Sequence, residues 1–150
     1  MNSLNISASG MSAQRTRMDL IAQNVANVNT TRDENGNPYR RRTVTFVEQS
    51  KDKAEFESLL AAKKTGLSYT SSVGKGVKIS SIVEDHVTAM KKVYEPENPD
   101  ADEDGYVTYP NVDTVTEMTN LIDANRSYEA NVTAFNATKN MALKGLEIGQ

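Results

Sequence analysis

The longest regular pattern of apolar and polar positions lies in the last third of the chain, from Asn111 to Ile148. The stretch has no proline, and its apolar residues recur at spacings of three and four, as on one face of a long α-helix with a near-heptad repeat. The row consists of Met118, Leu121, Tyr128, Val132, Phe135, Ala142 and Leu146, interrupted by the polar residues Asn125 and Lys139. Such a helix would be roughly 50 Å long. A compact domain of this size does not need that length, so we expect the helix to pack on partners.

The start of this helix is marked by Pro110, which ends the preceding segment. Asn111 or Asp113 can then cap the first turn through a side-chain oxygen.

A second helix is predicted from Ser3 to Asn27. Its apolar row repeats every seven residues and consists of Leu4, Met11, Met18 and Val25. The remaining surface is Ser, Asn, Gln and Thr with few charges, and Gly10 lies inside the helix, so it is poorly stable alone. An ordinary surface helix of a small domain is one interpretation. A helix surrounded by copies or relatives of itself fits the weak charge better.

The middle of the chain is predicted to be β-rich. A turn cluster at 33–38 precedes an alternating, β-branched strand at 43–47, and further strands are expected at 67–70, 76–83 and 87–94. Residues 51–64 form a short helix or an irregular loop. The predicted fold class is therefore α+β, with long N- and C-terminal helices paired as a coiled coil and a small β-rich domain between them. The expected domains are 1–32 with 110–150, and 33–109.

Two charged segments have competing interpretations. Arg40, Arg41 and Arg42 could bind phosphate, but a solvated strand face or a salt-bridged subunit edge is favoured, because the chain carries a net charge of -3. The loop from Asp100 follows the ligand spacing of an EF-hand calcium loop. Its twelfth position is Asn111 instead of Glu, and prolines precede the loop, which favours a tight polar turn.

Composition argues against several functional classes. The acidic balance gives no electrostatic footprint for nucleic acid. There is no cysteine, and the single histidine, His86, lies beside Asp85 in a predicted strand, which leaves little material for catalysis or a metal site. We expect no enzyme activity, no cofactor and no membrane insertion, and the N-terminus lacks the layout of a cleaved signal peptide.

Several motifs resemble the bacterial flagellar rod and hook proteins, and among them the proximal-rod members. The first is the run from Ser7 to Thr31, centred on Asn24-Val25-Ala26-Asn27. The others are Pro38-Tyr39-Arg40-Arg41, Gly105-Tyr106-Val107 and the helical segment 117–131. The resemblance covers about half of the chain. It is weak across 48–72 and departs at Glu97-Asn98, where a Gly-His pair is expected.

The resemblance implies an inner coiled coil of both terminal helices lining a tube, with the β-rich domain outside. It also implies export through the flagellar type III apparatus, directed by an uncleaved N-terminal region, and assembly with copies and neighbouring rod subunits into a rod that crosses the periplasm. Helices of this kind would be marginal in the monomer and ordered in the assembly.

We therefore expect a structural subunit of the flagellar basal-body rod, with these interface residues: Leu4, Met11, Met18, Asn24, Val25, Asn27, Arg40, Arg41, Arg42, Met118, Leu121, Asn125, Tyr128, Val132 and Phe135. The asparagines would set polar register and the arginines would contact acidic neighbours. A non-flagellar coiled-coil adaptor that forms a discrete oligomer is the first alternative. A calcium-binding module at 100–111 is the second.

Overall fold

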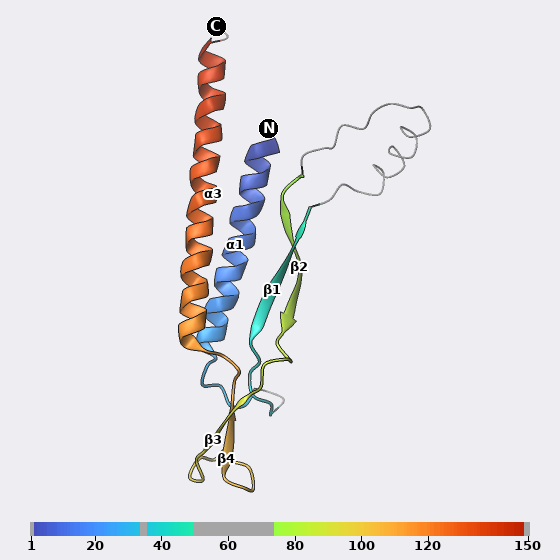
Figure 1. Cartoon of the computed structure of the whole chain (residues 1–150), viewed down its shortest axis with the longest axis vertical. Coiled ribbons are helices and arrows are strands. Elements are labelled where there is room, and N and C mark those ends of the chain that lie inside the picture. Colours follow the sequence, from blue (N-terminus) through green and yellow to red (C-terminus); the bar gives the residue numbers. More distant parts are fainter. Residues whose placement is uncertain (1, 34–35, 50–73, 149–150) are drawn as a thin grey trace, which may run out of the picture.

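The computed structural model describes residues 2–33, 36–49 and 74–148. Its helices and strands are α1 (Asn2–Ala26), β1 (Arg42–Glu48), β2 (Val77–Glu84), β3 (Lys91–Tyr94), β4 (Tyr106–Tyr109) and α3 (Thr114–Ile148). Two long helices with small antiparallel sheets between them confirm the α+β class (Figure 1). The segments expected at 51–64 and 67–70 lie outside the described residues.

The two helices lie side by side and run antiparallel (Figure 1). Near the end of α1, Asn24 Nδ2 donates to Glu117 Oε2 of α3 over 2.9 Å. Near its beginning, Gly10 lies against Asn131, and a Cβ at Gly10 would be 2.7 Å from the Asn131 amide oxygen. The pairs Asn24–Glu117 and Gly10–Asn131 are separated by the same number of residues in both helices, so the two helices keep one register. In this register Asn2 lies level with Lys139. The last turns of α3 therefore extend past the start of α1 (Figure 1).

Small and polar residues form the contact between the helices. Ser7, Asn24, Glu117 and Ala124 are buried there, and Gly10 allows a close approach. Each predicted apolar row lies one residue C-terminal to the residues that face the other helix. One residue corresponds to about 100° of rotation around the helix axis, so the apolar rows are turned away from the centre of the contact. The N-terminal row is half-buried, while Met118 and Leu121 are 54% and 38% exposed. The helices pack as expected, but the residues between them are small, and a coiled-coil geometry stays a prediction.

The described strands form two small two-stranded sheets, and the division of the chain into domains stays a prediction. The β1–β2 ribbon runs antiparallel from Arg42 opposite Glu84 to Glu48 opposite Val77, and it packs on α1. At the contact, Ser9 Oγ accepts the Val77 N–H over 3.1 Å. Gly76 has φ 115 and a Cβ there would collide with the Ser9 hydroxyl, so this close approach requires glycine. The β3–β4 hairpin extends away from the helices (Figure 1).

The strand predicted at 87–94 is shorter than expected, because the chain turns at Asp85. The Asp85 carboxylate accepts the N–H groups of Val87 and Thr88 over 2.9 and 3.0 Å and the Thr88 hydroxyl over 2.7 Å. These bonds, the Thr88 N–H first, lower the pKa of Asp85. The strand begins only at Lys91, and His86 lies in the turn, so its placement in a strand was wrong.

The long C-terminal helix begins at Thr114, and Asp113 is its cap. The Asp113 carboxylate accepts the Thr116 hydroxyl over 2.5 Å and the Val115 N–H over 3.3 Å. Of the two caps that the sequence allowed, Asp113 performs this role, and Asn111 is buried with other partners.

The buried apolar side chains of the described segments are few: Ala13, Leu20, Ile21, Val107 and Ala124. In those segments, neither helix has the length and apolar character needed to cross a membrane.

Candidate assembly interface

A buried polar junction joins the end of α1 to the beginning of α3. We define the polar junction as Asn24, Tyr39, Arg41, Asn111 and Glu117. The Asn24 side chain is 1% exposed and makes four hydrogen bonds. Its amide nitrogen donates to Arg42 O and Glu117 Oε2, and its oxygen accepts from Tyr39 Oη and the Arg42 N–H, all over 2.9 Å. Asn24 therefore fixes three segments of the chain at once.

Glu117 places a carboxylate in the centre of the junction, where its side chain is 1% exposed. Arg41 compensates the charge through two bonds to Glu117 Oε1, from Nη2 over 2.7 Å and from Nε over 2.9 Å. Asn120 adds a longer contact of 3.3 Å to the same oxygen. A buried carboxylate with its charge and hydrogen bonds matched is tolerated, whereas removing one partner is strongly destabilising.

Asn111 connects the junction to the chain between β2 and β3. Its side-chain oxygen accepts the Arg41 N–H over 2.9 Å, and its amide donates to the carbonyl oxygens of Asp85 and Thr88 over 3.0 and 3.2 Å. The junction thus holds α1, β1, α3 and the β2–β3 connection in one arrangement.

The three arginines of the predicted patch have different surroundings. Arg41 binds Glu117 inside the chain, and Arg42 pairs with Glu84 over 3.0 Å and lies over the Tyr39 ring. Arg40 makes no ion pair or hydrogen bond with any residue in the described part of the chain. Of the three, Arg40 is the one still available to an acidic neighbour.

The other two predicted asparagines make local bonds. Asn27 Nδ2 donates to the Gln23 carbonyl over 2.9 Å, and its oxygen accepts the Thr30 hydroxyl over 3.2 Å, which closes the end of α1. Asn125 is exposed and donates to Glu129 one turn along α3 over 3.2 Å. Neither contacts the other helix through these bonds.

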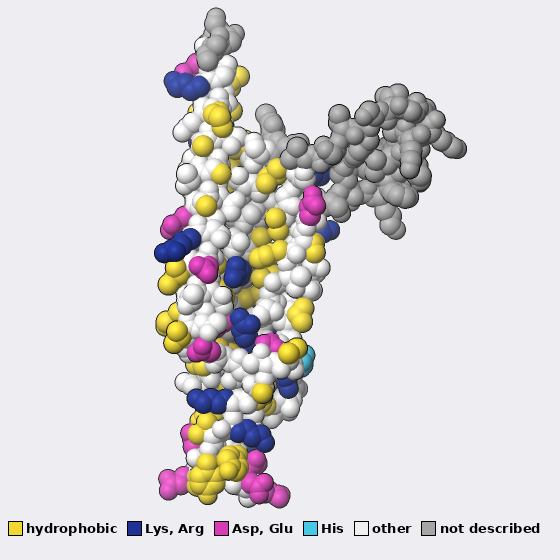
Figure 2. Space-filling model, viewed as in Figure 1, with side chains coloured by type: hydrophobic (Ala, Val, Ile, Leu, Met, Phe, Trp, Pro, Cys, Tyr) yellow, Lys and Arg dark blue, Asp and Glu magenta, His cyan; other side chains and the backbone are white. Residues whose placement is uncertain are grey.

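The predicted apolar interface residues lie at the margins of the helix pair or outside it. Seven are half-buried: Leu4, Met11, Met18, Val25, Tyr128, Val132 and Phe135. Met118 and Leu121 are exposed. Met118 lies with Val115 and Ile122 on the side of α3 turned away from α1, and we call these three the outer row; hydrophobic side chains follow this edge of α3 in Figure 2.

A second set of exposed apolar residues lies on the part of α3 that extends past the start of α1. It comprises Met141, Leu143 and Leu146, and we call it the overhang. Contiguous exposed apolar side chains mark interaction surfaces on soluble proteins. The outer row and the overhang are therefore candidate interface surfaces, and the sequence pattern pointed to this helix although not to all of these residues.

The acidic loop is the tight tip of the β3–β4 hairpin. Asp102 Oδ1 accepts the N–H groups of Asp104 and Tyr106 over 3.1 and 2.8 Å, and Asp100 is paired with Arg32 over 3.0 Å. Within the described segments, no three His, Cys, Asp or Glu side chains are grouped so that they could hold a metal ion. The only histidine is exposed, 4.0 Å from Glu84.

Sequence reasoning missed Glu117 and Tyr39 as interaction residues. Glu117 is an acidic residue in the first turn of a helix, where the helix macrodipole alone is enough to explain an acid. Only the path of the chain brings it against Asn24, which is distant in sequence.

Known proteins resemble this chain over nearly its full length. A family model of the flagella basal body rod protein matches residues 4–32, and one of the flagellar basal body rod FlgEFG protein C-terminal region matches residues 103–148. The flagellar basal-body rod protein FlgC of Bacillus subtilis is 48% identical over 153 residues, which is 99% of this chain and 97% of the relative. FlgC of Salmonella typhimurium is 39% identical over 150 residues, 100% of this chain and 98% of the relative. FlgC of Aquifex aeolicus is 41% identical over 140 residues, 92% and 88% of the two chains.

The matches confirm the resemblance that the terminal motifs predicted: the chain belongs to the FlgC family of flagellar basal-body rod proteins.

Proposed function

We propose that this chain is a structural subunit of the proximal flagellar rod and that its terminal helices assemble with those of neighbouring subunits into a tube. The observation that carries the proposal is the outer row of α3, three apolar side chains turned away from the partner helix in a chain of this family. Val115, Met118 and Ile122 are 73%, 54% and 55% exposed. Covering them in an assembly would remove apolar surface from water at about 25 cal/mol per Å².

The different positions of polar and apolar residues on the two helices support this proposal. Inside one subunit, the helices meet through small and polar residues and are fixed by the polar junction. Apart from the few buried apolar residues, the predicted apolar rows lie at the margins and on the outside, where neighbours can reach them. A fold that used its apolar rows internally would have little to offer to a neighbour.

Assembly would also complete the helices themselves. The overhang has no α1 residues beside it in the same subunit, and α1 is short of charge and contains Gly10. We expect both termini to gain order on assembly, as is common when folding is coupled to binding. This behaviour would suit a subunit that passes through the flagellar type III export apparatus unfolded and folds in the rod.

The test is removal and restoration of the gene in a flagellated bacterium that carries it. Without the chain, isolated basal bodies should have no complete rod and cells should not swim. Restoring the gene should recover both, and the chain should be found in the purified basal bodies. Complete rods in the deletion strain would refute the proposal.

The matches to FlgC relatives give no support to a non-flagellar coiled-coil adaptor. An adaptor would form one oligomer of fixed size, whereas a rod subunit has heterologous contacts that do not close. Sedimentation of the purified chain at rising concentration separates the two: a single discrete species that saturates would favour the adaptor.

A further inference from the structure

We propose that a pocket beside Arg17 is a subunit docking site that receives the acidic tip of the β3–β4 hairpin from a second copy of the chain. The acidic tip is defined as Tyr94, Glu97, Glu103, Asp104 and Tyr106. The inference rests on the proposed function, because it names one of the contacts by which subunits would join.

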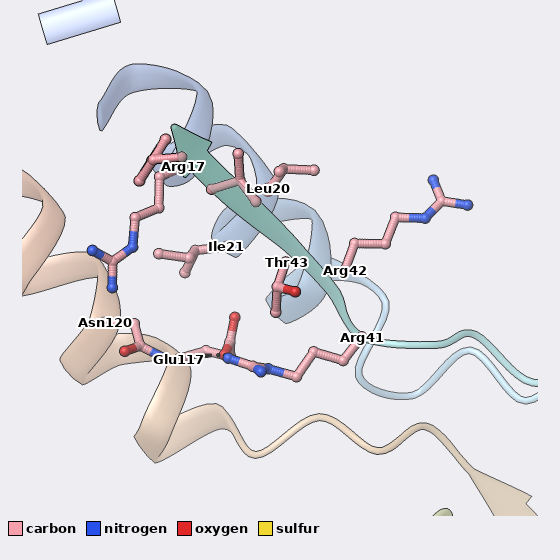
Figure 3. A pocket seen from close by; sticks show the side chains of 10 residues that line it. Arg17, Leu20, Ile21, Arg41, Arg42, Thr43, Glu117 and Asn120 are labelled. Carbon is pink, nitrogen blue, oxygen red and sulfur yellow. Dashed lines mark hydrogen bonds and ion pairs between the residues drawn. The ribbon is translucent and has the colours of Figure 1, made fainter. Parts of the chain in front are cut away.

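The pocket lies where α1, β1 and α3 meet (Figure 3). Its volume is about 250 Å³. One wall is apolar, with Leu20, Ile21 and Phe46, and the other carries guanidinium groups. It is smaller than the roughly 300–1,000 Å³ typical of small-molecule sites, so a side chain or two is a better fit than a cofactor.

Arg17 is the unsatisfied charge of this pocket. Its side chain reaches from α1 toward Asn120 on α3, whereas Arg42 points away (Figure 3). Arg41 is already paired with Glu117, and Arg42 with Glu84. Arg17 is half-buried, and across the described part of the chain it has no hydrogen bond or ion pair. A half-buried guanidinium without a carboxylate has lost hydration without compensation, which favours an acidic occupant.

The β3–β4 tip has the matching chemistry. Glu97, Glu103 and Asp104 are exposed and form no ion pair with any described residue, and Tyr94 and Tyr106 are 62% and 43% exposed. The two rings pack edge to face with centroids 5.3 Å apart. Acidic and hydrophobic side chains lie together at this end of the molecule in Figure 2.

The tip is also held in one shape before any contact is made. Asp102 Oδ1 accepts the N–H groups of Asp104 and Tyr106, and the Gly105 N–H donates to Asp102 O over 2.9 Å. Gly105 has φ 80, and a Cβ there would lie 2.9 Å from the Tyr94 ring. A preformed loop loses little conformational entropy on docking.

The occupant has to come from another molecule. The hairpin extends away from the helices, so the tip does not reach the pocket of its own chain (Figure 1). Pocket and tip lie at different places on one molecule, and such a heterologous contact repeats from copy to copy without closing. This is the kind of contact that a growing rod requires.

The absence of cysteine makes a direct test possible. Thr43→Cys places a thiol in the pocket, and Ala101→Cys places one in the hairpin loop without removing an acid of the tip. Both variants are co-expressed in cells lacking the wild-type gene, basal bodies are isolated, and disulfides are formed with an oxidant. The proposal predicts a dimer of this chain that requires both variants and disappears on reduction.

The matched control replaces Thr43→Cys by Thr133→Cys, an exposed threonine far along α3. The dimer should be absent with this control. In addition, Arg17→Met removes the charge but keeps an aliphatic stem, and it should weaken the equilibrium constant of the contact roughly tenfold, which corresponds to about 1.4 kcal/mol, so that less dimer is trapped.

Each other outcome has a defined meaning. Basal bodies that contain both variants but give no more dimer than the control would overturn this inference and leave the proposed function standing. A cross-link from the pocket cysteine to a protein of different mass would overturn the second copy as occupant. Rods that assemble without the chain would refute the proposed function itself.

Discussion

The buried side chain of Asn24 joins α1 to β1 and α3 through hydrogen bonds. Asn24 and Asn27 belong to the same short motif, and both were predicted to set polar register. The structure separates them: Asn24 is buried and makes four hydrogen bonds to three residues, and Asn27 closes its own helix end. The sequence could not distinguish the two, because the difference depends on residues that are distant along the chain.

Replacing Asn24 by leucine should destabilise the chain strongly. The substitution removes the Asn24 partner of Glu117 Oε2, of the Tyr39 hydroxyl and of the Arg42 backbone, while Glu117 Oε1 keeps its bonds to Arg41. Each unsatisfied buried group costs about 1–3 kcal/mol, so we expect a total loss of about 3 kcal/mol or more. Urea unfolding followed by circular dichroism measures it.

Asn27→Ala is the matched control, since it removes only local bonds. We expect a loss of about 1 kcal/mol or less. Equal losses for the two variants would mean that the polar junction does not stabilise the fold.

Gly10 and Gly145 provide a second contrast between residues of one type. A Cβ at Gly10 would meet Asn131, whereas a Cβ at Gly145 has nothing within 4 Å. Gly10→Leu should therefore cost about 1–3 kcal/mol through overpacking. Gly145→Ala should stabilise α3 by up to about 1 kcal/mol through helix propensity.

A double mutant with Asn131→Ala tests whether the facing side chain causes the stability loss of Gly10→Leu. In an Asn131→Ala background, Gly10→Leu should cost less, because the opposing side chain is gone. An unchanged cost in the two backgrounds would show that Gly10 is not limited by the facing helix.

Both helices were predictable from the sequence because their spacing repeats over many turns. The predicted helix at 3–27 is observed as Asn2–Ala26, and the one at 111–148 as Thr114–Ile148. The short elements were harder. The turn at Asp85 and the β4 strand depend on side-chain bonds to the backbone and on pairing between strands, which alternation of residue types does not reveal.

The cap of α3 gives the helix a dependence on pH. The pKa of Asp113 is lowered from its ordinary value of 3.8, first by the Thr116 hydroxyl and then by the Val115 N–H. A depressed carboxyl pKa stabilises the folded state above the ordinary value, and this contribution is lost as the pH falls below it. We therefore expect the urea concentration at the unfolding midpoint to decrease as the pH is lowered from about 5 to about 3, in part because the cap is lost.

Asp113→Asn isolates the contribution of the cap. Asparagine also caps helices but does not titrate, so the variant should lose less stability over the same pH interval than the unaltered chain. An identical pH profile for both chains would exclude Asp113 as a source of the dependence.

The described part of the chain is elongated, with few buried apolar side chains and with exposed apolar residues along α3 (Figures 1 and 2). Sequence pattern alone indicated a helix in need of partners. The pattern could not tell which residues meet inside a subunit and which remain outside. The residues that face the other helix and the predicted apolar row are offset by only one position. The sequence therefore predicted which helix carries the candidate interface, and the structure showed which side of that helix faces outward.

A charge in the outer row should separate folding from assembly. Ile122→Lys changes a residue that is 55% exposed, so the unfolding free energy of the chain should stay within about 0.5 kcal/mol. In cells, however, the variant should fail to restore rods and swimming, since the lysine would have to be buried against a neighbour. Ile122→Met keeps the position apolar and should restore both, and a swimming Ile122→Lys strain would contradict the assignment of the outer row.

The most direct measurement compares the solvent access of two methionines in the free chain and in isolated basal bodies. Met118 in the outer row and Met141 in the overhang are 54% and 67% exposed, and hydroxyl-radical oxidation read by mass spectrometry reports on each. The account predicts that both oxidise readily in the free chain and are protected in the rod. Equal oxidation of Met118 and Met141 in the two states would show that these surfaces stay uncovered, and the assembly role assigned to α3 would be wrong.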